Sequence, residues 1–421
     1  MQPQAPAAFA AFVGRAWADA TYDICFPGTG SPRRELLRLD HRPAVIDAGG
    51  CTRRTRCNGQ PLAVGLARNK GPMVSALQHD DCLGLFPVTP LPVATYREAL
   101  PPSRATEAPP DAARQVDLLR KHRDKRTPLG PPSPTRRAVA PLVAHRQRLV
   151  GDTVRRTKRL PSALKNSFPH VLQWFQDQET AIFCNGRSRW PTLQAAPLAR
   201  RATLERFCRA HHVRSADVIT TRSAAITNAV ALTTADGVIA PHTLLGHALV
   251  APLRVTLHAL ADFDTARAQR AHAHPAFPLL DALPGAGAVF APRLRVAFGA
   301  QRERGPAAAE LQQYAGIAPV TERRGKPSWG PWRLQCPTFL RQTFVAWAAE
   351  SIRPSCWAHV YDQQQRDKGH AHQAAVRALA CTWIRMLYRC WQERLPYDAS
   401  TYLQALHRRG SSLIQNLAKA S

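Results

Sequence analysis

Residues 9–115 alternate short apolar runs with polar stretches, a pattern typical of a mixed α/β domain. Strands are predicted at Phe12–Gly14 and Ala20–Phe26, which would pair across a turn, and at Pro61–Leu66 and Leu83–Val88. The third run is wholly apolar and is followed by polar residues, as at the end of a buried strand. We therefore expect an α/β domain in this part of the chain.

Between Arg120 and Lys165, apolar residues recur at helical spacing. The segment also carries fourteen lysines and arginines against two aspartates, so it predicts a long basic amphipathic helix. A charge run is usually only a solvated face, but unrelieved positive charge at this density favours contact with phosphate groups. The candidate contacts are Arg155, Arg156, Lys158 and Arg159.

Helical patterns continue through the second half of the chain. Leu198–His212 and His242–His274 are predicted helices, and the leucine spacing of the second predicts a coiled-coil arm that carries no chemistry of its own. Phe339–Ser351 and Gln373–Gln392 are strongly apolar-periodic. We interpret the tryptophans of these two segments as core residues and not as a platform for stacking bases.

Composition narrows the class of partner. The net charge is +28 over 421 residues, although charged residues make up only 20% of the chain. This balance predicts a polyanionic partner, nucleic acid first. A membrane surface is the alternative, but a membrane binder would gather its charge on one amphipathic helix, and here the charge is spread. We expect no membrane span and, because the ten cysteines lack zinc-site spacing, reduced thiols.

The stretch Leu283–Trp332 combines a Pro-Gly-x-Gly element with a basic loop. Gly285 and Gly287 lie between two apolar helical segments, which predicts a helix-hairpin-helix whose backbone N–H groups reach a nucleic-acid phosphate. The closing loop adds positive charge through Arg323 and Lys326. We predict that this stretch binds nucleic acid.

Several motifs resemble those of the insertion sequence one-ten family of bacterial transposases. They are Leu283–Gly287, Tyr314–Arg323, Cys336–Phe344 and Ala375–Ala380, with Asn69–Pro72, Arg148–Asp152 and Leu164–Asn166 upstream. The resemblance extends over nearly the whole chain and is most specific in the C-terminal half.

This resemblance implies an α/β plus α protein in three parts. Residues 9–165 would form a RuvC-like domain of ribonuclease-H fold that includes the basic helix, and residues 166–277 a helical coiled-coil arm. Residues 278–395 would form a mostly helical C-terminal transposase domain with the helix-hairpin-helix, followed by a tail at residues 396–421.

The resemblance also implies a chemistry and its partners. Four acids hold Mg²⁺, and a C-terminal serine attacks a DNA phosphate to form a covalent phosphoserine intermediate. A structured guide RNA from the element pairs with the donor and target DNA. Dimers that pair into tetramers, and a location in the bacterial cytoplasm at the nucleoid, are implied as well.

The chain departs from the family pattern at the metal-binding acids. The first three fall at Ala16, Ala67 and Ala108, and the fourth survives as Asp111, with Glu107 as the alternative donor nearby. One or two carboxylates cannot hold Mg²⁺ as a cage of four does. The sequence therefore puts Mg²⁺ binding in doubt.

The nucleophile is replaced as well. Arg324 stands at the serine position, and Ser328 lies four residues later, too far to substitute without rearrangement of the loop. Loss of the nucleophile removes the covalent route. The alternative explanation for the missing residues is that the chain is matched to the family motifs in the wrong register. This alternative applies more to the acids than to the serine.

Proline excess points in the same direction. Pro141 and Pro161 are expected to interrupt the basic helix and Pro252 the leucine-periodic one, each at ~3 kcal/mol or more. We take this as a sign of decay. Two functions follow: a DNA transposase by descent that is impaired or inactive, or a non-catalytic remnant that still binds the element's ends or guide RNA.

Overall fold

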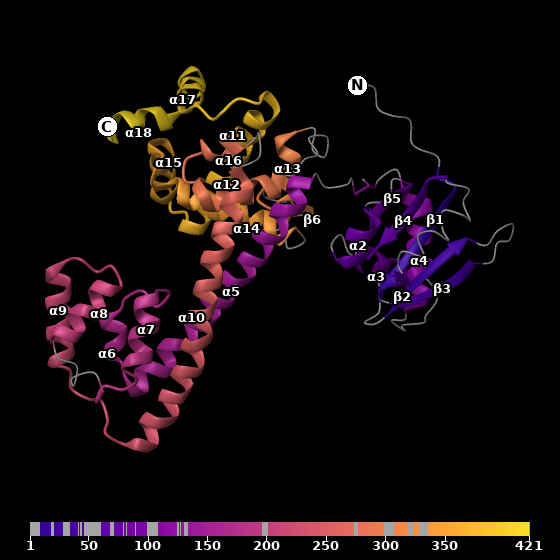
Figure 1. Cartoon of the computed structure of the whole chain (residues 1–421). Coiled ribbons are helices and arrows are strands. Elements are labelled where there is room, and N and C mark those ends of the chain that lie inside the picture. Colours follow the sequence, from indigo (N-terminus) through magenta and orange to yellow (C-terminus); the bar gives the residue numbers. More distant parts are fainter. Residues whose placement is uncertain are drawn as a thin grey trace. The chain divides into compact units, whose positions relative to one another are not determined.

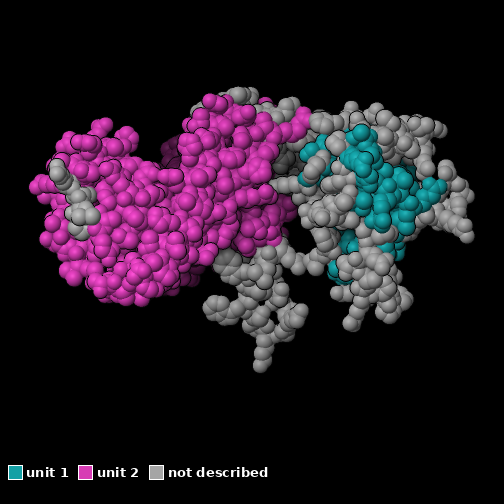
Figure 2. Space-filling model, turned by 60° about the horizontal axis from the view of Figure 1, so that its bottom comes forward, with its two compact units in different colours: residues 1–132 teal, residues 133–421 magenta. Residues whose placement is uncertain are grey.

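The structure is a computed structural model. It describes residues 9–17, 21–27, 34–40, 42, 44–45, 60–67, 71–78, 80, 82–88, 90–98, 108–123, 126, 128–129, 134–195, 201–272, 277–298, 307–318, 323–324, 326–327 and 336–420. The chain divides into two compact units, Met1–Pro132 and Ser133–Ser421 (Figure 2).

Unit 1 is built on a five-stranded mixed sheet (Figure 1). Its strands are β1 (Ala11–Trp17), β2 (Thr21–Pro27), β3 (Arg34–Asp40), β4 (Leu62–Leu66) and β5 (Leu83–Pro87). The order is β3-β2-β1-β4-β5, with β1 to β3 antiparallel and β4 and β5 parallel to β1. The four predicted strands are confirmed, and β3 is a further one.

Helices pack on both faces of this sheet. Because side chains alternate along a strand, Val64 and Ala63 face opposite sides. Val64 packs in a cluster with α2 (Pro72–Leu77), whereas Ala63 packs with residues of α3 (Pro90–Glu98) and α4 (Ala108–His122). The sheet is thus the middle of three layers, and the prediction of an α/β unit is confirmed.

Unit 2 contains two long helices that pack side by side, α5 (Pro134–Ser167) and α10 (Asp236–His272) (Figure 1). A group of shorter helices packs with them around an aromatic-rich core: α6 (His170–Trp174), α7 (Ala181–Arg189), α8 (Arg201–Ala210) and α9 (Ala216–Thr227). By length and composition α10 could cross a membrane, which is weak evidence because core helices of soluble proteins pass the same test. The absence of a membrane span stays a prediction.

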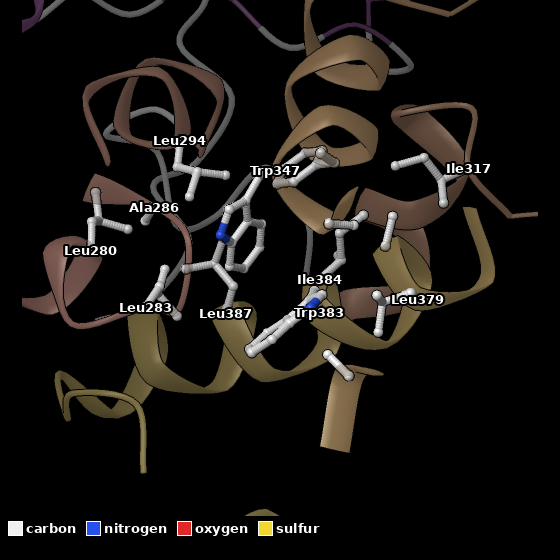
Figure 3. Packing of buried hydrophobic residues seen from close by; sticks show 14 of the residues in the cluster. Leu280, Leu283, Ala286, Leu294, Ile317, Trp347, Leu379, Trp383, Ile384 and Leu387 are labelled. Atoms are coloured by element: carbon white, nitrogen blue, oxygen red, sulfur yellow. The ribbon is translucent and has the colours of Figure 1, made fainter. Parts of the chain in front are cut away.

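The residues that the structure describes in the remainder of unit 2 are mainly helical, with two short strands. Its helices are α11 (Phe277–Asp281), α12 (Gly287–Phe298), α13 (Ala308–Tyr314), α14 (Thr338–Ser351), α15 (Cys356–Asp367), α16 (His372–Glu393), α17 (Ala399–Arg408) and α18 (Ser412–Ala420). Trp347 and Trp383 are fully buried at its centre, with ring centroids 5.0 Å apart (Figure 3). The interpretation of these tryptophans as core is confirmed.

Two predictions about the long helices are wrong. The basic segment is not one helix, because α4 ends at His122 and α5 begins at Pro134. The prolines do not interrupt the helices either, because α5 continues through Pro141 and Pro161, and α10 through Pro252. The packing of α5 against α10 holds each helix along its length and compensates for the missing hydrogen bonds.

Helix α5 belongs to unit 2, whereas most of it falls within the predicted first domain at residues 9–165. It packs against α10, and the predicted arm at residues 166–277 contains only one of these two helices. The predicted tail at residues 396–421 contains α17 and α18, and Leu413 of α18 is buried in the core. The domain limits themselves stay predictions.

Candidate functional site

The parallel strands β1 and β4 end at the same edge of the sheet. Their register pairs Gly14 with Gly65, so Ala16 in β1 and Ala67 directly after β4 come at equivalent levels. Side chains that follow adjacent parallel strands at one edge can act on a common ligand. The structure thus brings the first two predicted acid positions together, each as an alanine.

Helix α4 contacts β1 next to this edge. A Cβ atom on Gly14 would lie 1.8 Å from the carbonyl oxygen of Ala112, so only glycine permits this approach. Ala108 and Asp111 lie in the turn of α4 that leads to Ala112. Asp111 is therefore carried by the backbone beside Gly14, two residues before Ala16 along the strand, and Ala108 lies one turn earlier on α4.

Asp111, the one predicted acid position that holds a carboxylate, is paired with an arginine. Arg114 donates from Nη1 to Oδ1 of Asp111 at 2.8 Å, and both side chains are mostly buried. Arg114 lies on the same helix, and its positive charge neutralises the negative charge of the Asp111 carboxylate that would otherwise attract a metal ion. Glu107 lies outside the described residues.

A second carboxylate lies close to the same edge, and sequence reasoning missed it. Asp23 of β2 is directly opposite Ala16, and it accepts a hydrogen bond from Nε of Arg38 at 2.9 Å. Its polar side chain within an apolar strand was the signal that could have found it. Among the described residues, no group of three or more His, Cys, Asp or Glu side chains could hold a metal ion.

The basic loop of the C-terminal part forms a small hairpin. Two-residue strands β6 (Arg323–Arg324) and β7 (Lys326–Pro327) pair antiparallel, with Arg324 opposite Lys326. The two predicted basic contacts, Arg323 and Lys326, therefore lie in the same hairpin as Arg324, the predicted serine position. Ser328 lies outside the described residues.

The Pro-Gly-x-Gly element forms a tight turn between α11 and α12. Gly285 and Gly287 both have positive φ, +70° and +42°. A Cβ on Gly285 would lie 2.7 Å from the carbonyl oxygen of Glu350, whereas one on Gly287 would meet nothing within 4 Å. Gly285 therefore serves the packing of the turn on α14, and Gly287 is the glycine that leaves space at the start of α12.

Hydrogen bonding fixes this turn to the core. Nε1 of Trp347 donates to the carbonyl oxygen of Pro284 at 3.0 Å. Leu283 and Ala286 of the turn are buried in the same core (Figure 3). The turn is thus held rigidly, as a backbone site for an anion would require.

Some of the predicted basic residues of α5 are exposed to solvent, and one is partly buried. Arg155, Lys158 and Arg159 are exposed, and Arg155 forms an ion pair with Asp152. Arg156 is half-buried, and its Nη1 has no hydrogen-bond partner within the described part of the chain. Three of the four predicted contacts are therefore accessible to a polyanion.

Residues 278–363 match the family model described as Transposase IS116/IS110/IS902 family. The chain is 26% identical over 344 residues to the mini-circle putative transposase for IS117 of Streptomyces coelicolor, covering 80% of this chain and 83% of the relative. It is also 26% identical over 269 residues to the insertion element IS900 uncharacterized 42 kDa protein of Mycobacterium paratuberculosis, covering 62% and 63%. The insertion element IS110 uncharacterized 43.6 kDa protein of Streptomyces coelicolor is 31% identical over 134 residues, covering 30% and 31%.

Proposed function

Because the chain belongs to the IS116/IS110/IS902 family of insertion-sequence transposases, we propose that it still binds nucleic acid and has lost the ability to cleave DNA strands. One observation carries the proposal. The edge of the sheet where the acids are expected holds Ala16 and Ala67, and the carboxylate of Asp111 is paired with Arg114.

The proposal includes a RuvC-like fold for unit 1. A three-stranded antiparallel meander joined to two parallel strands, in the order β3-β2-β1-β4-β5, supports it. So does the helix that contacts β1 beside the edge where those strands end. The turn between α11 and α12 supports a helix-hairpin-helix in the same way.

Mg²⁺ does not fit the described donors. Its preferred ligands are several carboxylate oxygens with water, arranged octahedrally. Asp23 and Asp111 are each engaged by an arginine, and alanines stand at the other three positions. We therefore assign no catalytic step to a metal in this chain.

Strand exchange through a phosphoserine needs a hydroxyl nucleophile. Arg324 offers a guanidinium, which stays protonated and cannot attack phosphorus. In this position it would instead attract the phosphate, together with Arg323 and Lys326 of the same hairpin. The loop is then a binding element in place of a reactive one.

The partners in this proposal are DNA and a structured guide RNA from the element. The exposed basic residues of α5 and the net charge of +28 support contact with polyanions. Assembly as a dimer or tetramer, and a place in the bacterial cytoplasm at the nucleoid, belong to the same proposal. If binding alone persists, the chain acts as a non-catalytic protein on the element's ends or RNA.

Restoring the lost groups tests this account. The variant Ala16→Asp, Ala67→Glu, Ala108→Asp, Arg324→Ser is expected to form a covalent adduct with end DNA in the presence of guide RNA and Mg²⁺. Arg324→Ser alone is the matched control and is expected to form none, because it lacks the acids. If the fourfold variant melts cooperatively, binds DNA and still forms no adduct, the assignment of these positions is wrong.

A further inference from the structure

A cavity of about 450 Å³ lies in unit 2 among residues of α5, α12, α14 and α16. Arg293, Arg341, Arg377 and His372 line it, and the glutamines Gln147, Gln342 and Gln373 add amide groups. No carboxylate is among the described residues that line it. Its walls thus offer several hydrogen-bond donors and positive charge, although Nδ1 of His372 lies 3.7 Å from the carboxylate of Asp362 outside the lining.

Of these polar residues, Arg293 has the most deeply buried side chain, which is only 6% exposed. Its Nη2 donates to Oγ1 of Thr343 at a long 3.4 Å, and its Nε has no hydrogen-bond partner within the described part of the chain. The guanidinium lies 4.9 Å from the ring centroid of Phe290. Burial lowers the pKa of Arg293 to about 10, so the charged form is held at a cost.

The neighbouring acid is already engaged by other arginines. Arg146 donates to both carboxylate oxygens of Asp264, at 2.5 and 2.9 Å, and Arg267 lies 2.6 Å from Oδ1 of the same aspartate. Two cations therefore share one anion beside Arg293, and they also lower its pKa. A bound anion would relieve this excess of buried positive charge.

The start of α16 points to the same kind of ligand. His372 and Gln373 form its first turn, which contains no acid, and the N-cap residue Ala371 makes no capping hydrogen bond with its side chain. The backbone N–H groups at a helix start attract anions through their partial positive charge. This feature is independent of the buried arginine and borders the same cavity.

We infer that this cavity binds a phosphate group of a nucleic-acid strand through Arg293 and Arg341. Guanidinium forks bind phosphate oxygens in pairs, and the amides suit the attached sugar or base. The volume exceeds that of a phosphate alone and lies in the range of small-ligand sites, which leaves space for a nucleotide unit. The inference rests on the proposed binding of nucleic acid and adds a defined site to it.

The test compares Arg293→Met with Arg389→Met in the full chain. Methionine keeps the bulk of the side chain and removes its charge and donors. Arg389 is the matched control because it lies on α16, is exposed and pairs with Glu393 outside the cavity. The probe is a labelled single-stranded oligothymidine, titrated over a series of salt concentrations, with inorganic phosphate as competitor at matched ionic strength.

Arg293→Met is expected to bind the probe about tenfold more weakly and to lower the salt slope by about 0.7, while Arg389→Met stays close to the wild type. Its melting temperature is expected to be unchanged or higher, because an unpaired buried cation is removed. A lowered melting temperature with unchanged binding would assign Arg293 a merely structural role and overturn the inference.

Two further outcomes are separable. Equal binding by both variants and the wild type would overturn the cavity site and leave the proposed function standing, whereas no binding by the wild type would remove both. Competition by inorganic phosphate that is lost in Arg293→Met, with oligothymidine affinity unaffected, would identify free phosphate as the ligand and overturn the nucleic-acid assignment.

Discussion

Arg187 of α7 is a fully buried guanidinium with little to compensate it. Its Nη1 donates to the carbonyl oxygen of Pro191 at 2.5 Å, while Nε and Nη2 have no partner within the described part of the chain. Burial lowers its pKa to about 10. Like Arg293, it keeps a cation in the interior at a cost in stability.

We predict that Arg187→Met raises the free energy of unfolding by about 1 kcal/mol or more, because the buried charge is removed and the volume largely kept. Urea unfolding measures this. The exposed substitution Arg389→Met is the control and should stay within about 0.5 kcal/mol. A clear loss of stability in Arg187→Met would mean that its charge is compensated by something else.

Cys184 gives a prediction for pH. Burial raises the pKa of its thiol to about 11, with a smaller opposing effect from Arg254. The folded state thus favours the protonated thiol, and its contribution to stability is present below about pH 9 and is lost as the pH rises through about 11. Alkylation followed by mass spectrometry should modify the exposed Cys356 well before Cys184 at any pH below that value. Equal rates would contradict the burial of Cys184.

Residues that fill the cores could be predicted from the sequence, whereas residues whose role depends on a neighbouring side chain could not. Trp347 and Trp383 lie at apolar helical spacing, and that pattern alone identifies them as core. The pairing of Asp111 with Arg114 was visible as a spacing of three on a helix, yet its consequence for a metal needed the geometry. Asp23 beside Ala16 required the strand register, which one sequence does not specify.

At the scale of elements, the turn between α11 and α12 allows a matched comparison. Gly285→Ala combines a positive φ with a Cβ 2.7 Å from the Glu350 carbonyl oxygen, whereas Gly287→Ala has the positive φ and open space. We predict that Gly287→Ala costs about 1 kcal/mol and Gly285→Ala at least 1 kcal/mol more, measured by urea unfolding. Equal costs would contradict the close packing of Gly285 on α14.

The two substitutions should differ in the opposite order in their direct effect on DNA binding. Gly287 lies at the free start of α12, so Gly287→Ala should weaken DNA binding more than its stability cost explains. Gly285 lies against α14, so any loss of binding in Gly285→Ala should follow the loss of folded protein. Salt-dependent DNA affinity at a temperature where both variants are folded distinguishes these effects.

The sequence predicted β1, β2, β4 and β5 and the helices α8, α10, α14 and α16, because buried strands are apolar runs and apolar residues of packed helices recur at a period of 3.6 residues, but it missed β3. The division between α4 and α5 was missed although residues 128–134 include four prolines, Pro128, Pro131, Pro132 and Pro134. The high charge density there favours a helix, but the prolines end it. Pro141, Pro161 and Pro252 do not end their helices, because packing between α5 and α10 overrides local propensity.

At the scale of the whole molecule, the chain keeps what a nucleic-acid-binding protein needs. Each unit has its own buried core, and the fold does not look decayed despite the prolines. The charge of +28 and the exposed basic residues of α5 remain. The proposed loss of cleavage involves only the side chains of Ala16, Ala67, Ala108 and Arg324, so binding and cleavage can be lost separately.

Binding and cleavage of the end DNA can be measured in the same samples. The purified full chain is incubated with the element's end DNA, its guide RNA and Mg²⁺, and the same samples are run on native and denaturing gels. We predict a retarded complex on the native gel that weakens steeply with salt, and no protein–DNA adduct on the denaturing gel. A covalent adduct with the wild-type chain would contradict the account.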